Sequence, residues 1–129
     1  MQAQPLIAVR DVPAASRWYQ QVLGCQSGHG GNDYEQLIHG GRMILQLHRW
    51  ESHGHAHMGN PDVRPYGNGV LLWFYSEDFD DAVERAAAIS ATVLEGPKEN
   101  TNASHREIWL RDLDGYVVVI AGPYGDMGM

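Results

Sequence analysis

Residues 105–110 place three side chains that could do chemistry on one side of a single strand. Successive side chains of an extended chain point to opposite faces, so His105, Glu107 and Trp109 share one face. Histidine exchanges protons near neutral pH, a carboxylate can act as a general base, and an indole offers a flat surface for stacking. Two interpretations stay open for this set: the wall of a cavity, or a polar stripe that faces solvent.

The residues that follow this strand predict a hairpin. Asp112-Leu113-Asp114-Gly115 has the composition of a turn, with glycine where a positive φ is expected. The run 116–120 is mostly β-branched and returns as the partner strand. On the opposite side of the first strand, Ile108 and Leu110 suit packing against a helix.

Composition limits the class of protein. A chain of 129 residues is one domain by size and can bury a core without disulfides or metal. Sixteen acidic against nine basic residues give a formal charge of −7, which disfavours nucleic acid and anionic membranes as partners. There is no apolar segment long enough to span a membrane, and no N-terminal signal pattern. Cys25 is the single cysteine and reads as a packing residue, so a cytoplasmic location is expected.

Two halves of the chain follow the same order of elements. Each half reads as a strand, a helix that begins near an aspartate (Asp11 or Asp78), and three further strands. Gly24 should end the first helix, and Gly96-Pro97 should end the strand that follows the second helix. The expected elements are strand 6–9, helix 11–23 and strands 25–29, 34–39 and 43–48, then strand 70–75, helix 78–89 and strands 92–95, 105–110 and 116–120.

Two sets of residues stand out in this repeat. They are Asp11, Arg17-Trp18-Tyr19 and Leu23-Gly24 in the first half, and residues 107–116, Glu-Ile-Trp-Leu-Arg-Asp-Leu-Asp-Gly-Tyr, in the second. Together with the repeated order of elements, these residues resemble the vicinal oxygen chelate superfamily. The superfamily includes glyoxalase I, bleomycin-resistance proteins, fosfomycin-resistance enzymes and extradiol dioxygenases. The resemblance covers residues 4–123, and the fold alone does not specify a reaction.

The resemblance implies an α+β fold built from two tandem β-α-β-β-β units. The chain is then one glyoxalase/bleomycin-resistance-like domain, residues 1–129, with unit one at about 4–49, a linker at 50–68 and unit two at about 69–123. Curved mixed sheets would enclose a cavity, and chains of this kind commonly form homodimers.

In metal-dependent members, the first and fourth strands of each unit supply the ligands, usually histidine, glutamate or glutamine. The resemblance carries these four places onto Gln4, Gln46, Leu71 and Val119. Two amides and two hydrocarbons are poor ligands for a divalent ion, which needs carboxylate, imidazole or thiolate donors. A family-type metal is therefore disfavoured, and no cofactor is expected.

Strand parity adds further residues to the inner face. His48 lies two residues after Gln46, and Trp73 lies two residues after Leu71. The alternative for each tryptophan is simple filling of the core, and for His105 with Glu107 it is a structural hydrogen-bonded pair. The candidate ligand-binding set is Gln46, His48, Trp73, His105, Glu107 and Trp109.

The linker contains His53, His55 and His57 at alternate positions. Alternate histidines on an extended segment could hold a metal ion. No cysteine or fixed supporting group accompanies them, so a solvated or lid-forming loop is the favoured interpretation.

Two functions from different classes fit these residues. The first is a small-molecule-binding protein with a largely non-metal aromatic cavity, in which an aromatic or amphipathic ligand stacks on Trp73 and Trp109. The second is a glyoxalase- or dioxygenase-like lyase, isomerase or oxygenase. In that enzyme Glu107 would be the base, tuned by burial and by His105, or both residues would hold an atypical metal. The missing metal ligands favour the first.

Overall fold

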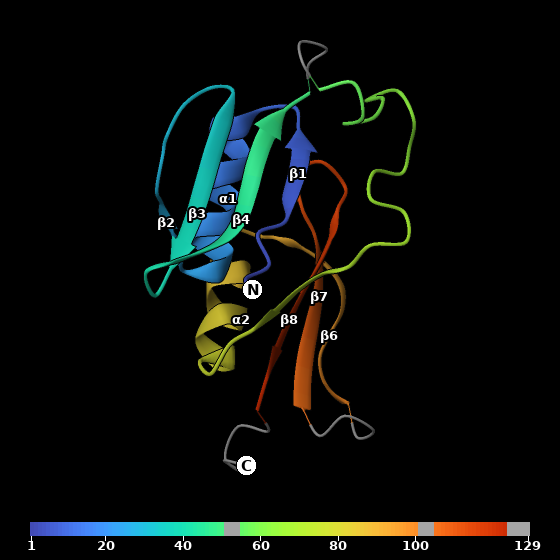
Figure 1. Cartoon of the computed structure of the whole chain (residues 1–129). Coiled ribbons are helices and arrows are strands. Elements are labelled where there is room, and N and C mark those ends of the chain that lie inside the picture. Colours follow the sequence, from blue (N-terminus) through green and yellow to red (C-terminus); the bar gives the residue numbers. More distant parts are fainter. Residues whose placement is uncertain (51–54, 101–104, 124–129) are drawn as a thin grey trace. The chain divides into compact units, whose positions relative to one another are not determined.

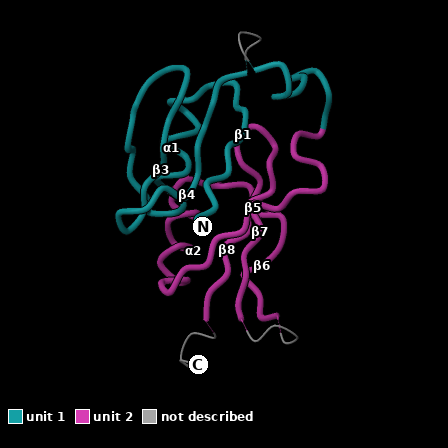
Figure 2. The backbone as a smooth tube through the Cα atoms, in the orientation of Figure 1, with its two compact units in different colours: residues 1–64 teal, residues 65–129 magenta. Residues whose placement is uncertain are grey.

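The computed structural model describes residues 1–50, 55–100 and 105–123. The chain divides into two compact units between Arg64 and Pro65 (Figure 2). Each unit contains one four-stranded mixed sheet and one helix. This arrangement confirms the predicted α+β fold and the tandem repeat.

Unit 1 has the strand order β1-β4-β3-β2, and β1 runs parallel to β4. Helix α1 covers one face of this sheet (Figure 1). The elements are β1 (Leu6–Val9), α1 (Val12–Leu23), β2 (Gln26–Ser27), β3 (Tyr34–His39) and β4 (Arg42–Arg49).

Helix α1 begins after Asp11 and ends before Gly24, as the sequence predicts. The Asp11 side chain accepts a hydrogen bond from the Ala14 amide at 3.0 Å, which satisfies one free donor of the first turn. Gly24 adopts a φ of 68° and donates its amide to the Gln20 carbonyl. The helix buries one face in the core of unit 1, namely Val12, Ala15, Ser16, Trp18, Tyr19 and Val22.

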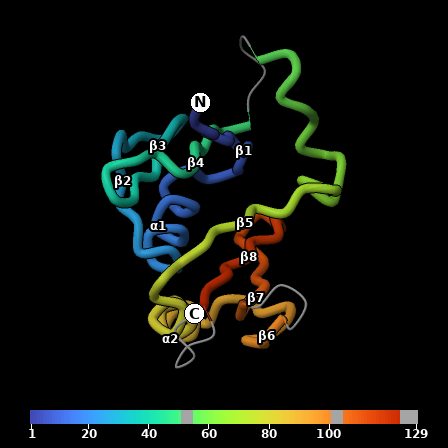
Figure 3. Tube along the Cα trace, turned by 60° about the horizontal axis from the view of Figure 1, so that its bottom comes forward, coloured from blue at the N-terminus to red at the C-terminus, as the bar shows by residue number. Residues whose placement is uncertain are grey.

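Unit 2 has the strand order β5-β8-β7-β6, so β5 and β6 are its edge strands. Strands β5 and β8 are parallel, and the other pairs are antiparallel. Figure 3 follows these elements from the yellow-green β5 to the red β8. They are β5 (Leu72–Tyr75), α2 (Phe79–Ala88), β6 (Thr92–Asn100), β7 (His105–Arg111) and β8 (Val117–Gly122).

Helix α2 begins directly after Asp78, as the sequence predicts, although the Asp78 side chain makes no capping hydrogen bond. One local prediction in unit 2 is wrong. Strand β6 does not end at Gly96-Pro97 and continues to Asn100, with shifts in its register against β7. An edge strand tolerates proline because the missing amide can face away from the neighbouring strand. Gly96 is needed there, since a Cβ at this position would lie 2.6 Å from the Glu107 carbonyl oxygen.

The turn between β7 and β8 is held by Asp112. Its carboxylate accepts hydrogen bonds from the amides of Asp114 and Tyr116, both at 2.9 Å. Gly115 supplies a φ of 99°. The hairpin then sets Trp109 opposite Val119 in the β7–β8 register.

Among the described residues, no helix is both long and apolar enough to cross a membrane.

Candidate functional site

Strand β7 presents two chemically different faces. Arg106 reaches α2, where it pairs with Asp80 and stacks over the Phe79 ring with its guanidinium carbon 4.5 Å from the ring centre. Ile108 and Leu110 lie on that same side of β7 and are buried. His105, Glu107 and Trp109 therefore lie on the face of the sheet that points away from α2.

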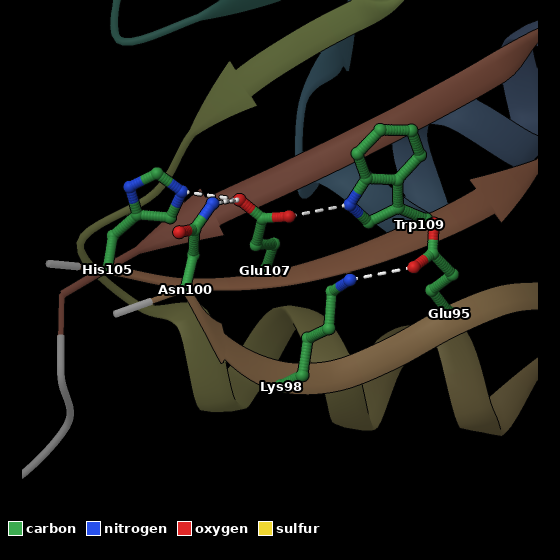
Figure 4. A network of polar contacts seen from close by, with 6 residues as sticks. All are labelled: Glu95, Lys98, Asn100, His105, Glu107 and Trp109. Atoms are coloured by element: carbon green, nitrogen blue, oxygen red, sulfur yellow. Dashed lines mark hydrogen bonds and ion pairs between the residues drawn. The ribbon is translucent and has the colours of Figure 1, made fainter. Parts of the chain in front are cut away.

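Glu107 is the centre of a hydrogen-bond network on this face (Figure 4). Its Oε1 accepts the indole N–H of Trp109 at 2.7 Å. Its Oε2 accepts the Asn100 side-chain amide at 3.0 Å and lies 2.6 Å from Nε2 of His105. The residue is only 2% exposed, so the network replaces the water that a free carboxylate would bind.

The hydrogen bonds to Glu107 lower the pKa of its carboxyl group. Burial raises its pKa, but the donors on Trp109, Asn100 and His105 together outweigh burial and lower the pKa to about 2. Glu107 is therefore ionised at neutral pH. A general base works best with a pKa near the working pH, so Glu107 is poorly suited to the role that the enzyme hypothesis assigns to it.

The rings of His105 and Trp109 contact this carboxylate, and the ring of Trp73 contacts both of those rings. We call these four residues the aromatic face: Trp73, His105, Glu107 and Trp109. The ring centres of Trp73 and Trp109 are 6.2 Å apart, with the planes at 84°. Trp73 also meets His105 at 5.9 Å and 82°. Trp73 is 45% exposed and Trp109 is half-buried, so neither simply fills the core.

The register explains why the two tryptophans meet. Trp73 of β5 and Trp109 of β7 both lie opposite Val119 on the central strand β8. Side chains that share a position across adjacent strands point to the same face. The aromatic face is thus a direct product of strand pairing within unit 2.

Gln46 and His48, the other two candidate residues, lie on β4 in unit 1 and contact different partners. The Tyr34 hydroxyl donates to Oε1 of Gln46 at 2.5 Å and accepts from the Gln36 side chain at 3.1 Å. The His48 ring lies 6.2 Å from the Tyr34 ring and 4.5 Å from the ring of His55. Tyr34 and Gln36 were not predicted as site residues, although the alternation of β3 places both on one face.

A second buried carboxylate, Glu35 on β3, was also not predicted. It is 3% exposed and accepts hydrogen bonds from the hydroxyls of Ser16 and Ser27 and from the amides of His29 and Gly30. Burial raises its pKa, and these donors lower it overall to about 2. Ser16 lies on α1, so Glu35 ties the helix to the loop before β3. Leu37, an apolar residue two positions along β3, is the sequence signal that could have marked this face as interior.

The two units can be compared position by position when Gln46 and Val119, which hold the same family metal position, are matched. Gln36 lies opposite Gln46 in unit 1, and Trp109 lies opposite Val119 in unit 2. One residue earlier on each strand, Glu35 then corresponds to Ile108. Glu35 and Glu107 therefore occupy different positions, and they lie on opposite faces of corresponding strands.

The residues at the four family metal positions do not fit a divalent ion. Oε1 of Gln46 accepts from Tyr34, and its amide donates to the backbone carbonyl of Gln4 at 2.9 Å. Leu71 and Val119 offer no donor atom. Within the part of the chain that the structure describes, no three His, Cys, Asp or Glu side chains are placed to hold a metal. Of the linker histidines, His53 lies outside the described residues.

The sequence model of the Glyoxalase/Bleomycin resistance protein/Dioxygenase superfamily matches residues 2–120. The chain belongs to this superfamily. The virulence protein STM3117 of Salmonella typhimurium is similar to this chain. The two sequences are 27% identical over 118 residues, which cover 90% of this chain and 79% of STM3117.

Solved structures share the superfamily fold. A protein of unknown function from Agrobacterium tumefaciens superimposes with a TM-score of 0.76 at 19% identity, covering 95% of this chain and 94% of the other. A fosfomycin resistance protein, FosX, from Listeria monocytogenes, complexed with Mn(II) and sulfate, gives a TM-score of 0.68 at 14% identity and covers 95% and 90%. At these identities the likeness concerns the fold alone.

Proposed function

We propose that this chain is a small-molecule-binding protein whose ligand stacks on the aromatic face of unit 2. The observation that carries the proposal is the contact between the nearly perpendicular rings of Trp73 and Trp109, which we call the ring corner. It lies beside the buried, ionised carboxylate of Glu107. Apolar rings with a few fixed polar groups are typical of ligand sites. The superfamily includes resistance proteins by name, which agrees with a small-molecule ligand.

Each residue of the aromatic face has a distinct role in this proposal. Trp73 and Trp109 supply the contact surface. Glu107 fixes the indole of Trp109 and the ring of His105 through hydrogen bonds. Because Nε2 of His105 faces Glu107, Nδ1 is the ring nitrogen left to orient a ligand. Gln46 and His48 belong to unit 1 and are not among the four residues of the aromatic face.

Trp109→Ala should weaken the binding of small aromatic compounds by about 1–3 kcal/mol, because it removes one wall of the ring corner. Trp109→Phe keeps a ring and should retain most of the affinity. Isothermal calorimetry measures both without depending on tryptophan emission. Leu113→Ala, an exposed apolar position in the β7–β8 turn, is the control. Equal affinity in Trp109→Ala and the wild type would show that the aromatic face is not the site.

The alternative function is a lyase, isomerase or oxygenase that uses an atypical metal. Only His105 and Glu107 of the aromatic face could act as ligands, and Oε2 of Glu107 is already engaged with Asn100 and His105. We therefore expect no stoichiometric metal in protein purified without a histidine tag, as measured by elemental analysis. About one zinc, nickel, manganese or iron per chain that resists chelator treatment would favour the enzyme instead.

We further propose that the protein forms a homodimer. Exposed apolar side chains lie at the sheet edges of both units, namely Leu6 on β1 and Val93 and Leu94 on β6. Pairing of two chains over such edges would remove apolar area and unpaired strand groups from water.

A further inference from the structure

The ring corner of the aromatic face has the geometry that suits a small cation. The two indole rings of Trp73 and Trp109 meet edge to face, with planes at 84° and centres 6.2 Å apart. A cation within about 6 Å of an aromatic ring centre is attracted by the negative face of the ring. Trp73 is 45% exposed, so the corner is accessible from solvent.

The groups behind the corner add negative charge. Glu107 is buried and ionised, and it accepts the indole N–H of Trp109. A hydrogen bond to a carboxylate polarises its donor, so electron density shifts toward the Trp109 ring. Among the rings of the aromatic face, this makes Trp109 the stronger cation acceptor.

The positive side chains nearby already have acidic partners. Nζ of Lys98, which lies opposite Glu107 in the β6–β7 register, is 2.7 Å from Oε1 of Glu95 (Figure 4). Arg106 lies on the other face of β7 and pairs with Asp80. Lys98 also interacts electrostatically with Glu107, but within the described part of the chain the hydrogen-bond partners of the Glu107 carboxylate are Asn100, Trp109 and His105.

We propose that the aromatic face binds an organic cation, an alkylated or quaternary ammonium group, seated in the corner between Trp73 and Trp109 with Glu107 behind it. This inference rests on the proposed function and names the chemical class of the ligand. A neutral aromatic compound would gain from the rings but not from the buried charge. The formal charge of −7 on the whole chain favours the approach of cations.

A pair of probes of equal shape tests the inference. Choline carries a trimethylammonium group, and 3,3-dimethylbutan-1-ol replaces that group with a neutral tert-butyl group. Calorimetry on the wild-type protein at low salt should show that choline binds on the order of tenfold more tightly than the alcohol. Equal binding of the two probes, or no binding of choline, would overturn the inference.

Two variants locate the bound cation. Trp73→Leu should reduce the preference for choline, whereas Trp73→Phe should keep more of it because a ring remains. Trp73 is exposed on an edge strand, so both variants should fold, as circular dichroism can check. An unchanged preference in Trp73→Leu would also overturn the inference. Failure of the proposed function would give a different result. In that case neutral aromatic compounds would bind the Trp109→Ala variant as tightly as they bind the wild-type protein.

Discussion

Glu35→Ala should lower the free energy of unfolding by about 2–3 kcal/mol, a large effect for a single substitution. The change leaves the Ser16 and Ser27 hydroxyls and the Gly30 amide without their acceptor. Ser16 is buried together with Glu35, so water cannot easily replace the carboxylate there, whereas Ser27 and Gly30 are exposed and can bind water instead. Chemical denaturation followed by far-ultraviolet circular dichroism measures the change.

A matched control is Glu84→Ala on the exposed side of α2. The same loss of a carboxylate should change the free energy of unfolding there by no more than about 0.5 kcal/mol. A loss at Glu35 as small as that at Glu84 would mean that the network around Glu35 does not hold α1 and the loop before β3 together.

Acid should destabilise the protein between about pH 4.5 and pH 2. In the folded state the pKa values of Glu35 and Glu107 are lowered from 4.5 to about 2, so the unfolded chain takes up these protons first. The stabilisation is therefore fully present above pH 4.5 and is lost as the pH falls through the folded-state values. Each shift corresponds to about 3 kcal/mol.

The contribution of each carboxylate can be separated by substitution. Glu107→Gln should be less stable at neutral pH and should show a smaller loss of unfolding free energy between pH 5 and pH 2 than the wild type. Glu84→Gln, at an exposed position on α2, is the matched control. Urea unfolding at a series of pH values measures the profile. A Glu107→Gln profile parallel to that of the wild type would contradict the lowered pKa.

The fold could be predicted because its signals are local. The Asp11 cap, the Gly24 end of α1 and the Asp112 turn each depend on a few neighbouring residues. Strand β6 was predicted too short because proline usually ends a strand. Its continuation depends on the pairing with β7, which the residues of β6 alone do not reveal.

The candidate site could be predicted only in part. Alternation along β7 was enough to put His105, Glu107 and Trp109 on one face. The joint position of Trp73 and Trp109 opposite Val119 depends on the register of three strands. Glu35 escaped prediction because its donors come from α1 and from the loop before β3, and two of them are backbone amides with no sequence signature.

The mismatch in position between Glu35 and Glu107 bears on the history of the chain. If the two units descend from one duplicated gene segment, the residues at corresponding positions have since diverged. Glu35 corresponds to Ile108, and Tyr34 corresponds to Glu107. In unit 1 the side of β3 that faces α1 carries a carboxylate that anchors a loop, and in unit 2 the side of β7 that faces away from α2 carries the carboxylate of the aromatic face. Under such a duplication, later mutations can change the aromatic face of one copy while the loop anchor of the other copy is preserved.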